Sequence, residues 1–235
     1  MYIYGTGDWT RTSMSQGREI LSLLRMTKFR HARMYKYLTM RITELFESDQ
    51  HGVVTLYHGS NAEFSKFDQS KAKIVNDLYG GGVAYFTDSI PVAQSYARTM
   101  TKARGGTPVL YKVNLRLGRV FDVDDTFSGP ELMEFVKHAA SKDAFLRGAR
   151  MLSLGTDKYK VLHQLETGQL SLTGEQVFRG LSGGMINTAA TRKILQKMGY
   201  DTLRYTGGLI MGQEKHNVYL AYYADNIEII DRKLM

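Results

Sequence analysis

A histidine, a glycine run and two tyrosines stand at spacings that together indicate a binding site. Residues 53–60 read VVTLYHGS, so that an apolar run ends at His58, a glycine and a serine. Such a run is typical of a buried strand whose end leaves backbone groups free for a ligand. Three glycines, residues 80–82, precede a second apolar run that contains Tyr85, and Tyr96 follows eleven positions later. Because glycines let the chain pass close to a bulky group, these features together indicate a ligand pocket.

The elements that must hold these residues are strands and a helix. Residues 91–100 are predicted to form a helix with a proline in its first turn, and its inward face should carry Ala93, Tyr96 and Ala97. A second helix is predicted at residues 191–198, before a glycine that ends it. Apolar alternation and apolar runs predict four further strands, at residues 109–117, 120–123, 218–222 and 227–230.

Two flanking regions have helical patterns. Residues 1–52 are predicted to be a basic helical extension, and residues 53–235 to be the main domain. Within the extension, apolar residues recur at helical spacing over residues 15–27 and 33–46. Within the main domain, residues from about 129 to 190 read as a helical insertion.

Charge and composition limit the function classes. The chain of 235 residues has a net charge of +8, no cysteine, and no apolar run of the roughly 20 residues that span a bilayer. We therefore expect a soluble, cytoplasmic protein with neither disulfides nor a membrane partner. Between Arg11 and Arg41, eight basic residues are opposed only by Glu19. This excess favours a polyanionic partner such as nucleic acid, although a solvated helix surface explains it too.

The spacing of His58, Tyr85 and Tyr96 resembles the nicotinamide-binding core of ADP-ribosyltransferases of the diphtheria-toxin and poly(ADP-ribose) polymerase class, the His-Tyr-Glu type. Later segments, residues 198–201 and 219–227, are similar to those of ADP-ribosyltransferase domains in phage and mobile-element proteins. The resemblance covers about residues 53–123 and 190–232. It implies an α+β fold with a split antiparallel β-sheet flanked by helices, here with an N-terminal helical extension and a helical insertion.

The resemblance assigns roles to the residues of the first motifs. His58 would bond the adenosine ribose of NAD+, and Gly59 would bond the nicotinamide carboxamide through its backbone. Tyr85 and Tyr96 would stack on the nicotinamide, whose ring is cationic in NAD+ and suits electron-rich faces. NAD+ is then the co-substrate, and no metal is expected. Taken alone, His58 would fit a core histidine and the tyrosines would fit core packing.

The chain departs from the family pattern at two positions. Ala93 stands where the family often has a carboxamide-binding serine, so that bond is either missing or supplied by Ser60. Val218 stands where the family has its catalytic glutamate. Three explanations stay open: Glu214 enters from the preceding glycine-rich loop and completes a catalytic set with His58 and Tyr85; Asn217 positions the ribose; or the domain binds NAD+ without reacting. We favour the first, because a carboxylate stabilises the charge that develops as nicotinamide leaves.

The sequence therefore predicts a mono-ADP-ribosyltransferase. It would transfer ADP-ribose from NAD+ to a macromolecular acceptor, either nucleic acid, including RNA, or protein, and release nicotinamide. A toxin or a phage-related effector fits this activity, and a toxin implies an inhibitory partner protein. The alternatives are an NAD glycohydrolase, which uses water as acceptor, and a catalytically inactive NAD-binding or interaction module.

Overall fold

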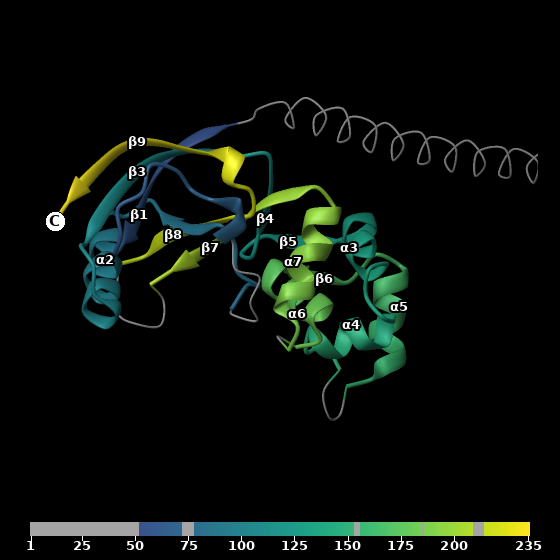
Figure 1. Cartoon of the computed structure of the whole chain (residues 1–235). Helices are drawn as coiled ribbons and strands as arrows, with labels where there is room; N and C mark the ends of the chain where they lie inside the picture. Colours follow the sequence, from purple (N-terminus) through teal and green to yellow (C-terminus); the bar gives the residue numbers. More distant parts are fainter. Residues whose placement is uncertain (1–51, 72–77, 153–155, 185, 209–213) are drawn as a thin grey trace, which may run out of the picture. The chain divides into compact units, whose positions relative to one another are not determined.

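The computed structural model describes residues 52–71, 78–152, 156–184, 186–208 and 214–235 (Figure 1). The chain divides into two compact units, residues 1–50 and 51–235, and the described residues belong to the second. The helices predicted at residues 15–27 and 33–46 therefore lie outside the described residues. So does most of the glycine-rich loop at residues 207–213.

Seven strands of the described residues form one mixed sheet, in the order β4-β7-β8-β2-β1-β3-β9. Neighbouring strands pair antiparallel except β4 and β7, which are parallel. The α+β class and the mainly antiparallel sheet are as predicted. The strands are β1 (Val53–Ser60), β2 (Ala84–Thr87), β3 (Val109–Arg116), β4 (Arg119–Asp122), β7 (Tyr200–Gly207), β8 (His216–Ala221) and β9 (Ile227–Leu234).

The sheet separates between β1 and β2. All eight residues of β1 pair with β3, and all four residues of β2 pair with β8. Between β1 and β2, however, the paired residues are Tyr57 and Thr87 alone within the described part of the chain. The residues of β1 that follow Tyr57 therefore have no β2 partner in register. This is the split predicted for the sheet.

Helix α2 (Ile90–Arg104) packs closely on β1. Its buried residues Ala93 and Ala97 meet the strand at Gly59, where an added Cβ atom would lie 2.0 Å from the Ala93 carbonyl oxygen. A glycine is therefore required for this helix to approach so closely. The sequence predicts Tyr96 on this inward face, but the structure differs: Tyr96 is 53 % exposed. One residue of helix turns it about 100° away from the Ala97 side.

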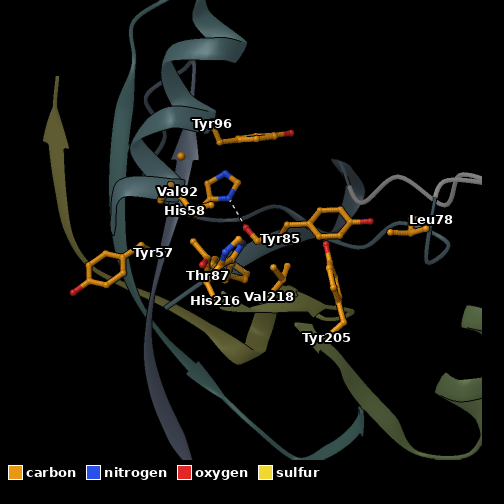
Figure 2. Close-up of a pocket in the computed structure, with 13 residues that line it drawn as sticks. Tyr57, His58, Leu78, Tyr85, Thr87, Val92, Tyr96, Tyr205, His216 and Val218 are labelled. Atoms are coloured by element: carbon orange, nitrogen blue, oxygen red, sulfur yellow. Dashed lines mark hydrogen bonds between the residues drawn. The ribbon is translucent and has the colours of Figure 1, made fainter. Parts of the chain in front are cut away.

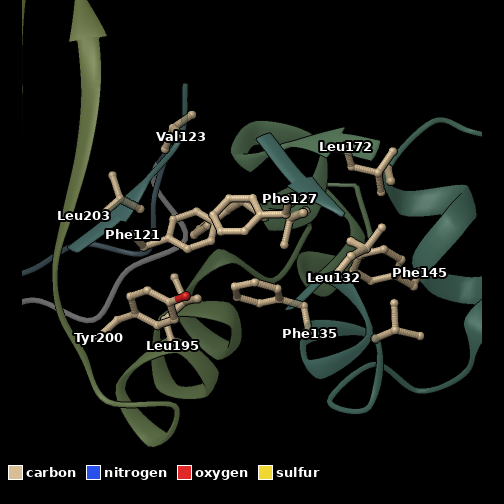
Figure 3. Close-up of a cluster of buried hydrophobic side chains, with 14 of the residues drawn as sticks. Phe121, Val123, Phe127, Leu132, Phe135, Phe145, Leu172, Leu195, Tyr200 and Leu203 are labelled. Atoms are coloured by element: carbon tan, nitrogen blue, oxygen red, sulfur yellow. The ribbon is translucent and has the colours of Figure 1, made fainter. Parts of the chain in front are cut away.

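The region between β4 and β7 is mainly helical, and its helices share a core with the sheet. The buried cluster brings together side chains from these helices and from β4 and β7 (Figure 3). In it, the rings of Phe121 and Phe127 stack at 5.5 Å, and Phe135 stacks on Tyr200 at 6.0 Å. The elements are β5 (Thr126–Ser128), α3 (Gly129–Val136), α4 (Lys142–Gly148), α5 (Lys158–Glu166), β6 (Ser171–Thr173), α6 (Gly174–Ser182) and α7 (Thr188–Lys197).

Short 3-10 turns, η1 (Gln69–Lys71) and η2 (Ala224–Asn226), complete the described elements. Strands β5 and β6 pair with each other as a small separate sheet. None of the helices in the described ranges combines the length and the apolar character needed to cross a bilayer.

Candidate functional site

A cavity of about 400 Å³ lies where the sheet separates, among residues of β1, β2, α2, β7 and β8 (Figure 2). These elements come from two distant stretches of the sequence, residues 53–104 and 200–221, and the sheet order and the packing of α2 bring them together. The cavity is lined by Tyr57, His58, Gly59, Leu78, Tyr85, Phe86, Thr87, Val92, Ala93, Tyr96, Tyr205, His216 and Val218. Four of the predicted site residues, His58, Gly59, Tyr85 and Tyr96, are therefore brought together.

His58 is held in one orientation and one tautomer. Its Nδ1 atom lies 2.8 Å from the backbone carbonyl oxygen of Tyr85. A carbonyl oxygen only accepts, so Nδ1 carries the hydrogen and Nε2 of the neutral ring is an acceptor. The rings of Phe67 and Phe86 stand 5.3 and 5.6 Å away, centre to centre. Burial lowers the pKa of His58 below its ordinary value, and the hydrogen bond to Tyr85 only partly opposes this. A neutral His58 can accept a hydrogen bond from a sugar hydroxyl.

The two predicted tyrosines border the cavity from different elements. Tyr96 projects from α2, on the same side as His58, and the ring of Tyr85 points from β2 toward Tyr205 and Leu78 (Figure 2). Tyr85 is half-buried and packs against the helical core, so core packing explains part of its environment. Both phenol rings nevertheless contribute to the cavity wall. Electron-rich ring faces are available there to a flat cationic group.

Ser60 is placed differently from its neighbour Gly59. Gly59 lines the cavity, whereas Ser60 does not. The hydroxyl of Ser60 instead accepts a hydrogen bond from the backbone N–H of Ala62 at 3.1 Å. The structure thus places Gly59, but not Ser60, at the cavity wall.

The strand β8 alternates between the cavity and the opposite side. His216 and Val218 line the cavity. Asn217 lies between them and is held by Asp88: its side-chain amide donates to Oδ2 at 2.7 Å and its backbone N–H donates to Oδ1 at 3.0 Å. Glu214 is exposed ahead of the strand and does not line the cavity. Neither predicted substitute for the family glutamate is therefore at the cavity wall in this structure.

His216 and Tyr205 are lining residues that the sequence interpretation missed. His216 is only 9 % exposed, and its Nδ1 lies 2.9 Å from the carbonyl oxygen of Glu214. Its position could have been found, because the period of two that puts Val218 at the wall puts His216 there too. Tyr205 carries no such signal, since it reaches the cavity only through the pairing of β7 with β8, in which it faces Val218.

The lining is rich in hydrogen-bonding and aromatic groups but holds no carboxylate among the described residues. It contains the imidazoles of His58 and His216 and the phenols of four tyrosines. The described residues also hold no group of three or more potential metal ligands. Imidazole nitrogens and several ring faces suit a ligand that combines sugar hydroxyls with a flat ring.

The sequence decides the family. A family model described as ADP-ribosyltransferase in polyvalent proteins matches residues 49–234. The chain belongs to this ADP-ribosyltransferase family. The match includes every cavity-lining residue and the split sheet that separates β1 from β2. Among curated proteins and solved structures, no significant match to the chain is found.

Proposed function

We propose that this family member is a mono-ADP-ribosyltransferase that uses NAD+ as co-substrate. The bond between the nicotinamide nitrogen and ribose C1′ breaks, and its electron pair leaves with nicotinamide. A nucleophilic atom of a macromolecule then bonds to C1′ and loses its proton. The observation that carries the proposal is the hydrogen bond from His58 Nδ1 to the backbone carbonyl oxygen of Tyr85, which joins β1 to β2 where the sheet separates. Both residues line a cavity that Tyr96 also lines.

The cavity residues can bind the parts of NAD+ as the resemblance implies. His58 offers Nε2 to a hydroxyl of the adenosine ribose, since its Nδ1 is occupied by Tyr85. Gly59 offers backbone groups to the carboxamide, on the side of β1 where pairing with β2 has ended. The rings of Tyr85 and Tyr96 can stack on the nicotinamide. These contacts hold the co-substrate close to the position at which it ionises.

For the acceptor, we favour a nucleic acid, such as RNA, over a protein. The chain has a net charge of +8, with an acid-poor stretch between Arg11 and Arg41 that lies outside the described residues. In the described part, α2 carries the exposed cations Arg98, Lys102 and Arg104 and no acidic residue. This helix also carries Tyr96, so a polyanion bound along it would pass beside the cavity. A phage-related effector or a toxin acting in the cytoplasm, with an inhibitory partner in the latter case, fits this chemistry.

A second candidate is binding of NAD+ with hydrolysis alone or with no reaction. The observation that favours it is Val218, which lines the cavity at the position of the family glutamate. A valine cannot stabilise the positive charge that develops on the ribose. Nicotinamide release without labelled macromolecules would indicate hydrolysis. NAD+ binding without nicotinamide release would indicate a non-catalytic module.

The test uses NAD+ labelled in its adenosine half, the full chain and a cell lysate. Nicotinamide release is measured beside the label in macromolecules, with parallel nuclease and protease digestions. We expect labelled macromolecules whose label is released by the nuclease digestion. A matched pair of variants accompanies the wild type: Tyr96→Ala at the cavity and His138→Gln in the exposed turn after α3. Only the first should lose labelling. Absence of label from all macromolecules would refute the proposed transfer, whether or not nicotinamide is released.

A further inference from the structure

The strand β8 places an imidazole at the cavity, two residues before the position where the family has its glutamate. His216 and Val218 lie on the same face of this strand because side chains alternate along it. No carboxylate of the described residues shares the lining. His216 and His58 are therefore the two lining side chains, within this part of the chain, that can act as bases near neutral pH.

The hydrogen bonding of His216 leaves one ring nitrogen for a ligand. Nδ1 lies 2.9 Å from the carbonyl oxygen of Glu214, and it must donate because that oxygen only accepts. Nε2 has no hydrogen-bond partner among the described residues, and it is not one of their fully buried, unpaired polar atoms. In the neutral ring, Nε2 thus carries a lone pair that no described residue uses, on a side chain that lines the cavity.

Gly207 makes room for this ring. It pairs with His216 in the β7–β8 ladder, and a Cβ atom added to it would lie 2.5 Å from Nε2 and 2.9 Å from Cε1. Any side chain at position 207 would push the ring from its place. The orientation of His216 therefore depends on two neighbours, the Glu214 carbonyl on one side and the missing side chain of Gly207 on the other.

We propose that His216 takes the place of the missing carboxylate and accepts, through Nε2, a hydrogen bond from a hydroxyl of the nicotinamide ribose. This inference rests on the proposed function. Such an acceptor increases the electron density of the hydroxyl oxygen beside C1′ and so stabilises the positive charge that develops there. His58 then serves one ribose of NAD+ and His216 the other. The chain thereby uses two imidazoles where the family uses an imidazole and a carboxylate.

The role requires a neutral ring. A protonated His216 would donate instead of accept, and would place a positive charge beside an oxocarbenium ion. Turnover should therefore fall in acid. The other titratable side chains of the lining are Tyr57 and His58 from β1, Tyr85 from β2, Tyr96 from α2 and Tyr205 from β7. Beside β8 stand Asp88, which binds Asn217, and the exposed Glu214 and Lys215.

Three variants distinguish the roles of Nδ1 and Nε2 of His216. In His216→Asn, the amide stands near the position of Nδ1 and keeps a donor for the Glu214 carbonyl, but nothing replaces Nε2. In His216→Gln, the amide reaches the position of Nε2 and can accept a hydrogen bond without taking up a proton. His138→Gln is the matched control, because His138 is exposed outside the cavity. Thermal unfolding of each variant tests whether it is folded.

The measurements are nicotinamide release, NAD+ affinity and the NMR signal of ¹⁵N-labelled histidine. We expect His216→Asn to lose about 100-fold in kcat, with a change of Kd for NAD+ of about fivefold or less. His216→Gln should recover part of the loss and should lack the acid decline of kcat that is expected of the wild type. In the wild type, the Nε2 resonance of His216, identified by its absence in His216→Asn, should move on NAD+ addition.

Two results would overturn the inference: a folded His216→Asn variant with at least a third of the wild-type kcat, or an Nε2 resonance that NAD+ binding leaves unchanged. Failure of the proposed function is distinguishable, because the wild type would then label no macromolecule. The Nε2 resonance of His216 still tests the inference in that case. A change on NAD+ addition reports contact between Nε2 and bound NAD+, and an unchanged resonance refutes that contact. If NAD+ does not bind at all, both proposals fail.

Discussion

The ring of His58 links two motifs across the split in the sheet, because its Nδ1 donates to the backbone carbonyl oxygen of Tyr85 at 2.8 Å. The two residues are 27 positions apart in sequence, and the strands that carry them are paired only at Tyr57 and Thr87 in the described structure. This hydrogen bond therefore joins β1 to β2 where their ladder has ended. It also fixes the tautomer that leaves Nε2 open to a ligand.

Replacing His58 should separate its structural bond from its ligand contact. In His58→Asn, an amide donor remains near the Tyr85 carbonyl while the Nε2 acceptor is lost. We expect NAD+ binding to weaken by about 1 to 2 kcal/mol, as for one lost hydrogen bond, with a small change in unfolding free energy. His58→Ala should lose binding and also stability, because the Tyr85 carbonyl loses its donor. Titration calorimetry measures the NAD+ affinity, and urea unfolding measures the stability. Equal NAD+ affinity in wild type and His58→Asn would contradict the contact assigned to His58 Nε2.

The low pKa of His58 predicts how stability depends on pH. Burial lowers its pKa in the folded state below the ordinary value of 6.5. As the pH falls below 6.5, the unfolded chain takes up a proton that the folded protein resists, so the unfolded state is favoured. Stability contributed by the neutral ring is thus present above about pH 6.5 and is lost as the pH falls toward the folded-state pKa.

The pH measurement compares wild type with His58→Asn. The urea midpoint of each is followed from about pH 7.5 to 5, and His58→Asn should show a shallower decline below pH 6.5. Other titrating groups affect both proteins alike, so the difference between the two curves isolates His58. Parallel curves would show that this imidazole does not resist protonation in the folded protein.

Local patterns predicted most of the elements that position the site. The alternation in residues 109–117 corresponds to β3, and the proline predicted in the first turn of a helix lies in the first turn of α2. The motif spacing also led to His58, Tyr85 and Tyr96, which line one cavity. Such signals are carried by neighbouring residues, so one sequence is enough to find them.

The rest of the site depends on contacts between distant residues. Tyr205 reaches the cavity because β7 pairs with β8, and nothing near it in sequence indicates that pairing. The inward placement expected for Tyr96 is wrong, because the buried face of α2 is narrow and consists of Ala93 and Ala97. His216 differs from Tyr205, because it stands two residues before Val218 on the same strand and the period of two puts both at the cavity wall.

Gly59 should be as important for the position of α2 as for ligand binding. A Cβ atom at this residue would lie 2.0 Å from the carbonyl oxygen of Ala93 and 2.8 Å from the backbone nitrogen of Ala97. Backbone atoms cannot yield as side chains do, so Gly59→Ala must move the helix. We expect a loss of about 1 to 3 kcal/mol in unfolding free energy, together with weaker NAD+ binding through the displaced Tyr96.

The matched change for Gly59→Ala is Ser60→Ala, one residue further along β1. It removes only an exposed hydrogen bond to the Ala62 backbone, so its cost should be below about 1 kcal/mol. Urea unfolding of the two variants gives the comparison. Equal stability of Gly59→Ala and wild type would show that α2 does not press on β1 as described.

Glu214→Gln tests the carboxylate predicted from the sequence. The exposed side chain of Glu214 lies outside the cavity lining, while its backbone carbonyl holds His216. A change confined to the side chain keeps that carbonyl. We therefore expect nicotinamide release within about threefold of wild type. A loss of about 100-fold with unchanged NAD+ affinity would instead show that this carboxylate enters the site during turnover, as the sequence interpretation held.

Gly207→Ala should disturb His216 without changing any chemical group of the cavity. The backbone of Gly207 lies within β7 and outside the left-handed region that favours glycine, so alanine is compatible with its conformation. The added methyl group would nevertheless lie 2.5 Å from Nε2 of His216 and must turn the ring away. If that nitrogen contacts the ribose, kcat for nicotinamide release should fall about tenfold or more.

The control for Gly207→Ala is Gly199→Ala, which follows α7 in open space at a positive φ of 86°. There alanine strains the backbone, so stability should fall by about 1 kcal/mol while kcat stays near the wild-type value. The two variants thus separate backbone strain from displacement of the imidazole. Gly207→Ala is also introduced into the His216→Asn variant, where the methyl group has no imidazole to displace. If kcat falls again in this background, the effect of Gly207→Ala has a different cause. We expect the double variant to be no slower than His216→Asn alone, as for two changes that act through one group.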